Sequence, residues 1–156
     1  MLMEGRFAID APVERVWAAL FDVPTMAGWV PGVTAARRLD DRHYEITVEQ
    51  RVAFLTARFE TLLELQEVDP PRRVSFTLEG KDGRIGSSIK VLTTILLEPE
   101  SAGRTALVYR NDMSVFGRLG TIGFAVIKRK AREIEEEFAR RANAALAGDG
   151  DARATV

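Results

Sequence analysis

Cysteine is absent from the 156 residues of this chain, and histidine occurs only once, at His43. The lack of cysteine excludes disulfide bonds, thiolate-bound zinc, iron–sulfur clusters and cysteine nucleophiles. One histidine cannot build a multi-histidine metal site, and His43 follows Asp40-Asp41-Arg42, a sequence typical of a turn between strands. We therefore expect no metal site, no required cofactor and a solvated position for His43.

An excess of charge of one sign is also absent, because 22 Lys and Arg residues oppose 23 Asp and Glu residues and leave a net charge of -1. This balance argues against a protein that neutralises a phosphate backbone, so nucleic acid is not expected as a partner. No apolar run approaches the roughly 20 residues that span a bilayer, and residues 1–10 lack the apolar core of a signal peptide. We expect a cytoplasmic protein, either free or peripheral at the inner membrane.

Two segments with helical periodicity enclose a long stretch with strand periodicity. Apolar residues at Val13, Val16, Trp17 and Leu20 follow a helix-opening proline and predict a helix that ends near Asp22. Residues 23–32 contain two prolines and two glycines and predict an apolar loop. Alternation then predicts strands at residues 33–39, 44–51, 56–68, 74–79, 86–98 and 105–113, with turns at 40–42, 69–72, 80–83 and 99–103.

The last part of the chain, from Arg118 to about Ala147, has no proline and is rich in Ala, Glu, Arg and Lys, which predicts a long helix. Residues 7–9 form a short apolar segment that favours a strand, so the order strand, helix, six antiparallel strands and long helix predicts an α+β fold in which a curved antiparallel sheet wraps around the C-terminal helix. The small residues Gly120, Gly123 and Ala125, where this helix meets the sheet, predict an apolar cavity between them. We expect residues 1–147 to form this domain and residues 148–156 to form a disordered tail.

This order of elements resembles the START-like helix-grip (SRPBCC) superfamily, whose members mostly bind or carry hydrophobic molecules. Five segments narrow the resemblance to the family of the carbon monoxide dehydrogenase G subunit. They are Phe7-Ala-Ile-Asp-Ala-Pro-Val-Glu-Arg-Val-Trp17, Met26-Ala-Gly-Trp-Val-Pro-Gly-Val33, Val68-Asp-Pro-Pro-Arg72, Gly80-Lys-Asp-Gly83 and Gly117-Arg-Leu-Gly-Thr-Ile-Gly123. The resemblance implies a non-catalytic accessory protein of a molybdenum hydroxylase, linked to the membrane and to a bound quinone or lipid.

The residues themselves give little support for catalysis. Most carboxylates alternate onto outward strand positions or the exposed helix face, and Ser87, Ser88 and Ser114 have only His43 as an imidazole base. The glycines of residues 80–83 and 117–120 lack the spacing of a nucleotide-binding loop. We therefore expect no catalytic residues.

The predicted inward face mixes large apolar side chains with tyrosine, threonine and asparagine, as a pocket for an amphiphilic ligand requires. We predict that the ligand contacts Trp29, Tyr44, Phe59, Phe76, Val91, Tyr109, Asn111, Met113, Ile122 and Val126. Structural roles for these side chains remain an open alternative.

A second predicted surface combines Phe116 with basic residues that precede the acidic run of the last helix. We predict membrane or partner contact through Phe116, Arg118, Lys128, Arg129 and Arg132, although i,i+4 pairs with glutamates also fit a solvated helix face. We place the cavity mouth between Trp29, residues 81–83 and Phe116. Two alternatives to a carrier stay open: a recruitment module with a solid core, and a polyketide cyclase-like enzyme using Tyr109 and Asn111.

Overall fold

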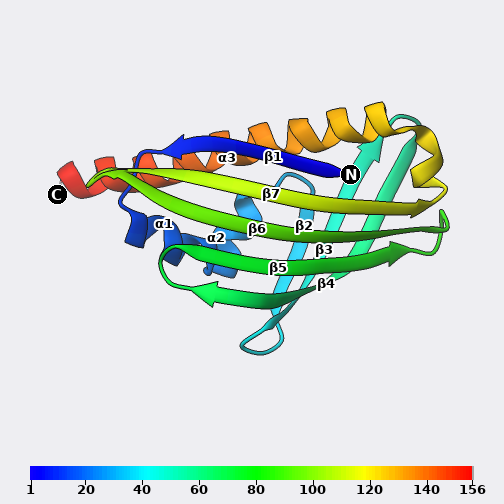
Figure 1. The fold of residues 1–156 in the computed structure, drawn as a ribbon, viewed down its shortest axis with the longest axis horizontal. Coiled ribbons are helices and arrows are strands. Elements are labelled where there is room, and N and C mark those ends of the chain that lie inside the picture. The colour runs from blue at the N-terminus through cyan, green and yellow to red at the C-terminus, as the bar shows by residue number, and fades with distance from the viewer. Residues whose placement is uncertain (156) are drawn as a thin grey trace.

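The computed structural model describes the backbone of residues 1–155 and the side chains of residues 1–147. The elements occur in the order β1 (Leu2–Ile9), α1 (Val13–Leu20), α2 (Val23–Trp29), β2 (Val33–Arg38), β3 (His43–Val52), β4 (Leu55–Asp69), β5 (Arg73–Asp82), β6 (Ser87–Ser101), β7 (Arg104–Gly117), the 3-10 helix η1 (Leu119–Ile122) and α3 (Phe124–Thr155) (Figure 1). The predicted disordered tail, residues 148–156, lies outside the residues whose side chains are described.

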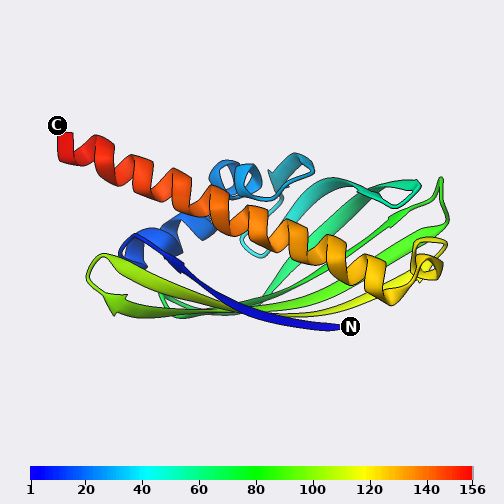
Figure 2. The same cartoon turned by 90° about the horizontal axis from the view of Figure 1, so that it is seen from above.

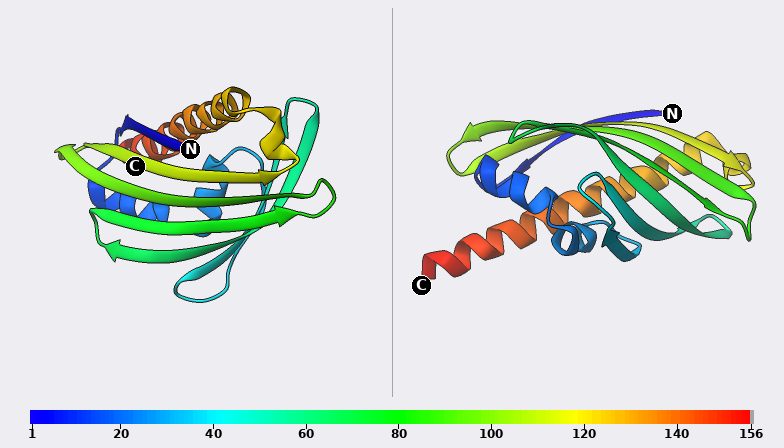
Figure 3. Two further views of the ribbon diagram at one scale, coloured as in Figure 1. Left: turned by 45° about the vertical axis from the view of Figure 1, so that its right-hand side comes forward. Right: turned by 90° about the horizontal axis from the view of Figure 1, so that it is seen from below.

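The strands form one antiparallel sheet in the order β1-β7-β6-β5-β4-β3-β2. Consecutive strands from β2 to β7 are neighbours. Strand β1 lies at the edge of the sheet beside β7, and every residue of β1 pairs with β7. The sheet curves around α3, which crosses its concave face, while α1 and α2 cover one end (Figures 2 and 3). The predicted α+β fold, a curved antiparallel sheet wrapped around a long C-terminal helix, is confirmed.

Three local predictions are wrong. Residues 23–29 form helix α2 rather than a loop, because the Asp22 side chain accepts a hydrogen bond from the Thr25 N–H and Pro24 lies in the first turn, where prolines fit. The turn predicted at residues 80–83 belongs largely to β5, which continues to Asp82. The last helix begins at Phe124 rather than Arg118, because Gly123 has a φ of 117° and separates η1 from α3.

The interior contains two groups of packed apolar side chains. The larger group surrounds Ile9, Val16, Trp29 and Leu107 and joins α1, α2 and the end of the sheet beside them to α3. The smaller group joins the β3–β4 hairpin to η1 and the start of α3, through Val52, Leu55, Ala57, Phe59 and Leu119. These groups hold α3 at both ends of the sheet and leave the middle of the concave face for the cavity.

Candidate functional site

An apolar cavity of about 420 Å³ lies between the concave face of the sheet and α3. Side chains from all seven strands and from α1, α2, η1 and α3 line it, and most of them are Val, Ile, Leu, Met or Phe. Its volume falls within the range of pockets that hold drug-sized ligands, roughly 300–1,000 Å³. The predicted cavity between sheet and helix is therefore present.

The cavity wall contains seven of the side chains that we predicted to contact a ligand: Tyr44, Phe59, Phe76, Val91, Tyr109, Asn111 and Met113. The strand alternation brings them together, because side chains two residues apart point to the same face of a sheet. Their contact with a ligand stays a prediction.

The other three predicted residues do not line the cavity. Trp29 is buried in the larger packed group, where its ring meets the Phe138 ring edge-on at a centroid distance of 5.9 Å. Ile122 and Val126 pack against the smaller group at the opposite end. They help to close the two ends of the cavity.

The structure does not support the mouth that we predicted. Trp29 is buried, and Asp82 is buried in an ion pair with Arg84. Phe116 and Lys81 lie together in a groove lined by outward-facing side chains of the sheet. None of these side chains lines the cavity, so they do not surround an opening.

Two polar side chains of the cavity wall have structural hydrogen bonds. The Gln50 amide donates to the Pro31 carbonyl oxygen at 2.6 Å, and the Thr61 hydroxyl donates to the Ile46 carbonyl oxygen at 2.6 Å. These bonds hold neighbouring segments together.

Four other polar side chains of the wall form a connected cluster, which we call the Glu135 cluster: Thr93, Tyr109, Asn111 and Glu135. The Thr93 hydroxyl donates to Asn111 Oδ1 at 2.8 Å, and Asn111 Nδ2 donates to Glu135 Oε1 at 3.2 Å. The Tyr109 hydroxyl donates to Glu135 Oε2 at 2.6 Å. Tyr109 and Asn111 of β7 thus donate directly to one carboxylate of α3, and Thr93 of β6 joins the cluster through Asn111.

A glycine of the neighbouring strand β1 leaves the space that the Tyr109 side chain occupies. Gly5 of β1 pairs with Tyr109, and a Cβ atom at Gly5 would overlap the phenol ring and its hydroxyl. The glycine therefore lets the ring lie across β1 toward α3, where Phe7 also contacts it with ring centroids 6.3 Å apart. Burial and the hydrogen bond to the Glu135 carboxylate raise the pKa of Tyr109 to about 12, so the phenol is a donor at neutral pH.

Sequence analysis missed Glu135, which we assigned with its acidic neighbours to the exposed helix face. Its side chain is only 15% exposed, and Arg132, which we expected to pair with Glu136, lies 3.8 Å from the Glu135 carboxylate. The signal was present in the spacing, because Glu135 lies four residues after Ala131 and three before Phe138, both on the apolar stripe.

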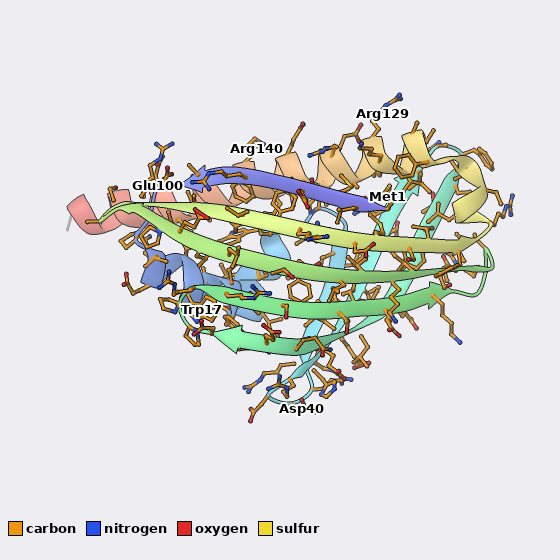
Figure 4. All side chains as sticks on the ribbon, viewed as in Figure 1. Met1, Trp17, Asp40, Glu100, Arg129 and Arg140 are labelled. Carbon is orange, nitrogen blue, oxygen red and sulfur yellow. The ribbon has the colours of Figure 1, made fainter. Side chains whose placement is uncertain are left out.

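Four predicted contact residues, Phe116, Arg118, Lys128 and Arg129, lie toward the end of the molecule that contains the smaller packed group, whereas Arg132 lies beside Glu4 of β1. Phe116 is 58% exposed, and two further phenylalanines at this end are also exposed: Phe54 at 75% on the β3–β4 turn and Phe124 at 60% at the start of α3. The Lys128 ammonium lies 5.8 Å from the centre of the Phe124 ring. Arg118, Arg129 and Arg132 are exposed, and Arg129 points away from the sheet (Figure 4).

His43, the candidate base for nucleophilic catalysis, is three strands away from Ser87 and Ser88 of β6 and four strands away from Ser114 of β7. His43 begins β3, is partly exposed and lies between Asp40 and Glu64, at 2.8 and 2.9 Å, near the protruding β2–β3 loop (Figure 4). The Ser87 hydroxyl at the other end of the sheet accepts a hydrogen bond from the Leu119 N–H.

In the part of the chain that the structure describes, no group of three His, Asp or Glu residues is arranged to hold a metal ion. Among the described helices, none combines the length and apolar character needed to cross a membrane.

Comparison with solved structures identifies the fold. A conserved protein from Geobacillus kaustophilus superposes with a TM-score of 0.87 at 19% identity, covering 95% of this chain and 96% of that protein. A START superfamily protein from Mycobacterium smegmatis superposes with a TM-score of 0.72 at 15% identity, covering 94% and 97%. No curated protein sequence matches the chain significantly.

The sequence profile of the family described as the carbon monoxide dehydrogenase G subunit (CoxG) matches residues 5–147. Proteins of this family and of the START-like fold are generally binding proteins without catalysis, which suggests a ligand-binding or carrier role. The match covers most of β1, the whole of the other six strands and the described side chains of α3, including the cavity wall. The chain belongs to the CoxG family.

Proposed function

We propose that this protein binds and carries a hydrophobic small molecule, quinone-like or lipid-like, in the cavity between the sheet and α3. The observation that supports the proposal most strongly is the cavity itself, because protein interiors are normally packed to the density of organic crystals. An apolar space of about 420 Å³ leaves its wall without packing partners, and a ligand would supply them. Burial in the cavity would also remove the ligand's apolar surface from water.

The two alternatives fit this interior less well. A recruitment module without a ligand would have a solid core under α3. The cyclase-like enzyme was expected to use Tyr109 and Asn111, whereas the Tyr109 hydroxyl and one Asn111 N–H already donate to Glu135. We therefore favour a carrier that performs no reaction and needs no cofactor of its own.

Family membership supports a more specific setting. We propose that the carried molecule serves a molybdenum hydroxylase of the carbon monoxide dehydrogenase type, with this protein acting as an accessory protein. A small amphiphile with a long apolar part crosses water poorly, so an enzyme that uses one benefits from a protein that shields it.

The carrier proposal predicts that protein purified without detergent contains an extractable hydrophobic molecule. Organic extraction followed by mass spectrometry should recover one amphiphile class in an amount comparable to the protein. After delipidation, the neutral fluorophore N-phenyl-1-naphthylamine should bind with an increase in fluorescence, and the extracted molecule should displace it. Protein that yields no amphiphile and also fails to bind the fluorophore would contradict the carrier function.

We also propose that the end with the exposed phenylalanines approaches an anionic membrane surface when the ligand is exchanged. Phe54, Phe116 and Phe124 offer apolar side chains, and Arg118 and Arg129 offer positive charge close to them. A basic residue near anionic lipid contributes roughly 1 kcal/mol, and an exposed aromatic side chain inserts favourably at the lipid–water boundary. Several weak contributions of this kind give reversible, salt-sensitive binding.

The substitution Phe116→Asp should weaken binding to vesicles of phosphatidylglycerol and phosphatidylcholine about tenfold at low salt, because it removes an apolar contact and adds a negative charge. Sedimentation of protein with vesicles measures this. Val68→Asp is the matched control, since Val68 is 39% exposed and lies near the opposite end of the sheet. Both variants should melt within a few degrees of the wild type. Equal vesicle binding by both variants would count against this orientation.

A further inference from the structure

The Glu135 cluster offers a ligand more unused hydrogen-bond acceptor positions than unused donors. Its carboxylate lies in a mostly apolar wall, and a carboxylate has about four acceptor positions. Within the described residues, Oε1 accepts one hydrogen bond, from Asn111, and Oε2 accepts one, from Tyr109, with Arg132 at a longer distance. The carboxylate therefore has acceptor positions to spare.

The donors of the cluster are largely used within it. The Tyr109 hydroxyl and the Thr93 hydroxyl each have one proton, and both protons are directed to acceptors of the cluster. Asn111 uses its oxygen for Thr93 and one N–H for Glu135, which leaves its second N–H. A ligand that reaches the Glu135 cluster meets spare acceptor positions on Glu135 and one spare donor within the cluster, the second N–H of Asn111.

We propose, on the basis of the carrier function proposed above, that the Glu135 cluster selects a ligand whose polar end is a neutral hydroxyl, as in a long-chain alcohol or the reduced, hydroquinone form of a quinone, and rejects one whose polar end is a carboxylate. A hydroxyl donates its proton to Glu135 and accepts from the second Asn111 N–H. A carboxylate has no proton to donate, and it places a negative charge beside another in a space with little water.

The two positively charged residues near the cluster, Arg132 and Lys130, do not reverse the preference for a hydroxyl over a carboxylate. Arg132 is outside the cavity wall, 46% exposed, and its guanidinium also donates to the Glu4 carbonyl oxygen at 3.4 Å. Lys130 lines the cavity, but it precedes Glu135 by five residues and so leaves α3 about 140° away around the helix axis. Lys130 is partly exposed, and access to water weakens the attraction of a cation for an anion relative to a buried contact.

Matched probes test the selection directly. Hexadecan-1-ol and hexadecanoate have the same chain length and differ in the polar end, and each can displace N-phenyl-1-naphthylamine from delipidated protein at pH 8. We expect the alcohol to bind about tenfold more tightly than the carboxylate, because one hydrogen bond to a charged group contributes about this much to affinity. Hexadecanoate that binds as tightly as the alcohol, or more tightly, overturns the proposal.

Three variants identify the group responsible. In Glu135→Gln, the affinities for hexadecan-1-ol and hexadecanoate should lie within about threefold of each other, mainly because hexadecanoate binds more tightly than it does to the wild type. Glu136→Gln is the control, since Glu136 is the exposed neighbour and its substitution should preserve the wild-type ratio. Tyr109→Phe should also preserve the preference for the alcohol, because it removes a competing donor and leaves the carboxylate in place.

The outcomes separate this inference from the carrier function. An unchanged ratio in Glu135→Gln, or the same loss of preference in Tyr109→Phe, overturns the role of the carboxylate, while binding of the fluorophore still supports a carrier. Absence of fluorophore binding to the wild type, together with the absence of an extractable amphiphile, overturns the carrier function itself. Thermal melting identifies any variant that does not fold, and the comparison of the two probes on the wild type requires no substitution.

Discussion

Replacing Val91 with tryptophan should lower the affinity for N-phenyl-1-naphthylamine by about a hundredfold while leaving the protein folded. Val91 lies in the middle of β6, and its side chain is part of the cavity wall. An indole at this position would occupy space that the ligand needs. A ligand that loses contact with about 100 Å² of apolar wall loses roughly 2.5 kcal/mol, which is close to a hundredfold in affinity.

The next residue of the strand provides the control. Leu92 is 46% exposed and points to the opposite face of the sheet, so Leu92→Trp makes a similar addition outside the cavity. The affinity of the Leu92→Trp variant for the fluorophore should stay within about twofold of the affinity of the wild type. Val91→Trp should retain the circular dichroism of the wild type, since overpacking costs about 1–3 kcal/mol where a core is full and less beside a void.

Titration of both variants distinguishes a cavity site from a surface site. A hundredfold loss in Val91→Trp with little change in Leu92→Trp places the fluorophore under α3. Equal affinities in a folded Val91→Trp variant would mean that the fluorophore binds elsewhere, and the carrier function would lose its main support.

The contrast between Val91 and Leu92 also illustrates why the sequence predicts the cavity wall so well. A strand has a period of two, and a sheet with one solvated face converts that period into a list of inward side chains. The prediction required only the approximate extent of each strand. Errors of two or three residues at the ends of β5 and β6 did not change which side chains face α3.

The sequence was less informative where glycine and proline have more than one role. Pro24 suggested a loop, yet a proline in the first helical turn removes no hydrogen bond and is compatible with α2. Gly80 suggested a turn, yet it lies within β5, where a Cβ atom would overlap the Glu60 carbonyl oxygen of the adjacent strand. The turn follows at residues 83–86, and Gly86 has a φ of 59° there.

The Glu135 cluster could not be recognised from the sequence alone for a different reason. Tyr109 and Asn111 are 26 and 24 residues away from Glu135 along the chain, and only the crossing of α3 over β7 brings them together. Four of the five residues from Glu133 to Glu137 are acidic, so composition alone favours a solvated face. The position of one glutamate on the apolar stripe was the smaller signal.

Asp82 should have the largest effect on stability among the charged residues of the sheet, because its carboxylate is buried and fully hydrogen-bonded. Its side chain is 3% exposed, and Oδ2 accepts from the Arg58 N–H at 2.8 Å and from Arg84 Nη2 at 3.0 Å. Oδ1 accepts from the Arg84 N–H at 3.0 Å and from Arg84 Nε at 3.3 Å. The pairing of β4 with β5 ends at Glu60 and Lys81, so this carboxylate continues the link between the strands.

The substitution Asp82→Ala should lower the free energy of unfolding by about 2–3 kcal/mol, because it leaves the Arg58 and Arg84 N–H groups without their acceptor. Urea unfolding followed by circular dichroism measures the change. Asp41→Ala is the control: Asp41 is 95% exposed and pairs with Arg38 on the β2–β3 loop, where an ion pair contributes little. A change below about 0.5 kcal/mol is expected for the control.

The pH dependence separates the charge of Asp82 from its shape. The hydrogen bonds from Arg84 and from the Arg58 N–H lower the pKa of Asp82 to about 2 in the folded protein, from 3.8 when unperturbed. The stabilisation by the ionised form is thus fully present above the unfolded pKa and is lost as the pH falls through about 4 toward 2. Asp82→Asn, which keeps the shape, should be less stable than the wild type by a constant amount above pH 5. That difference should shrink between pH 4 and pH 2, and a difference that stays constant down to pH 2 would assign the stabilisation to packing rather than to the carboxylate charge.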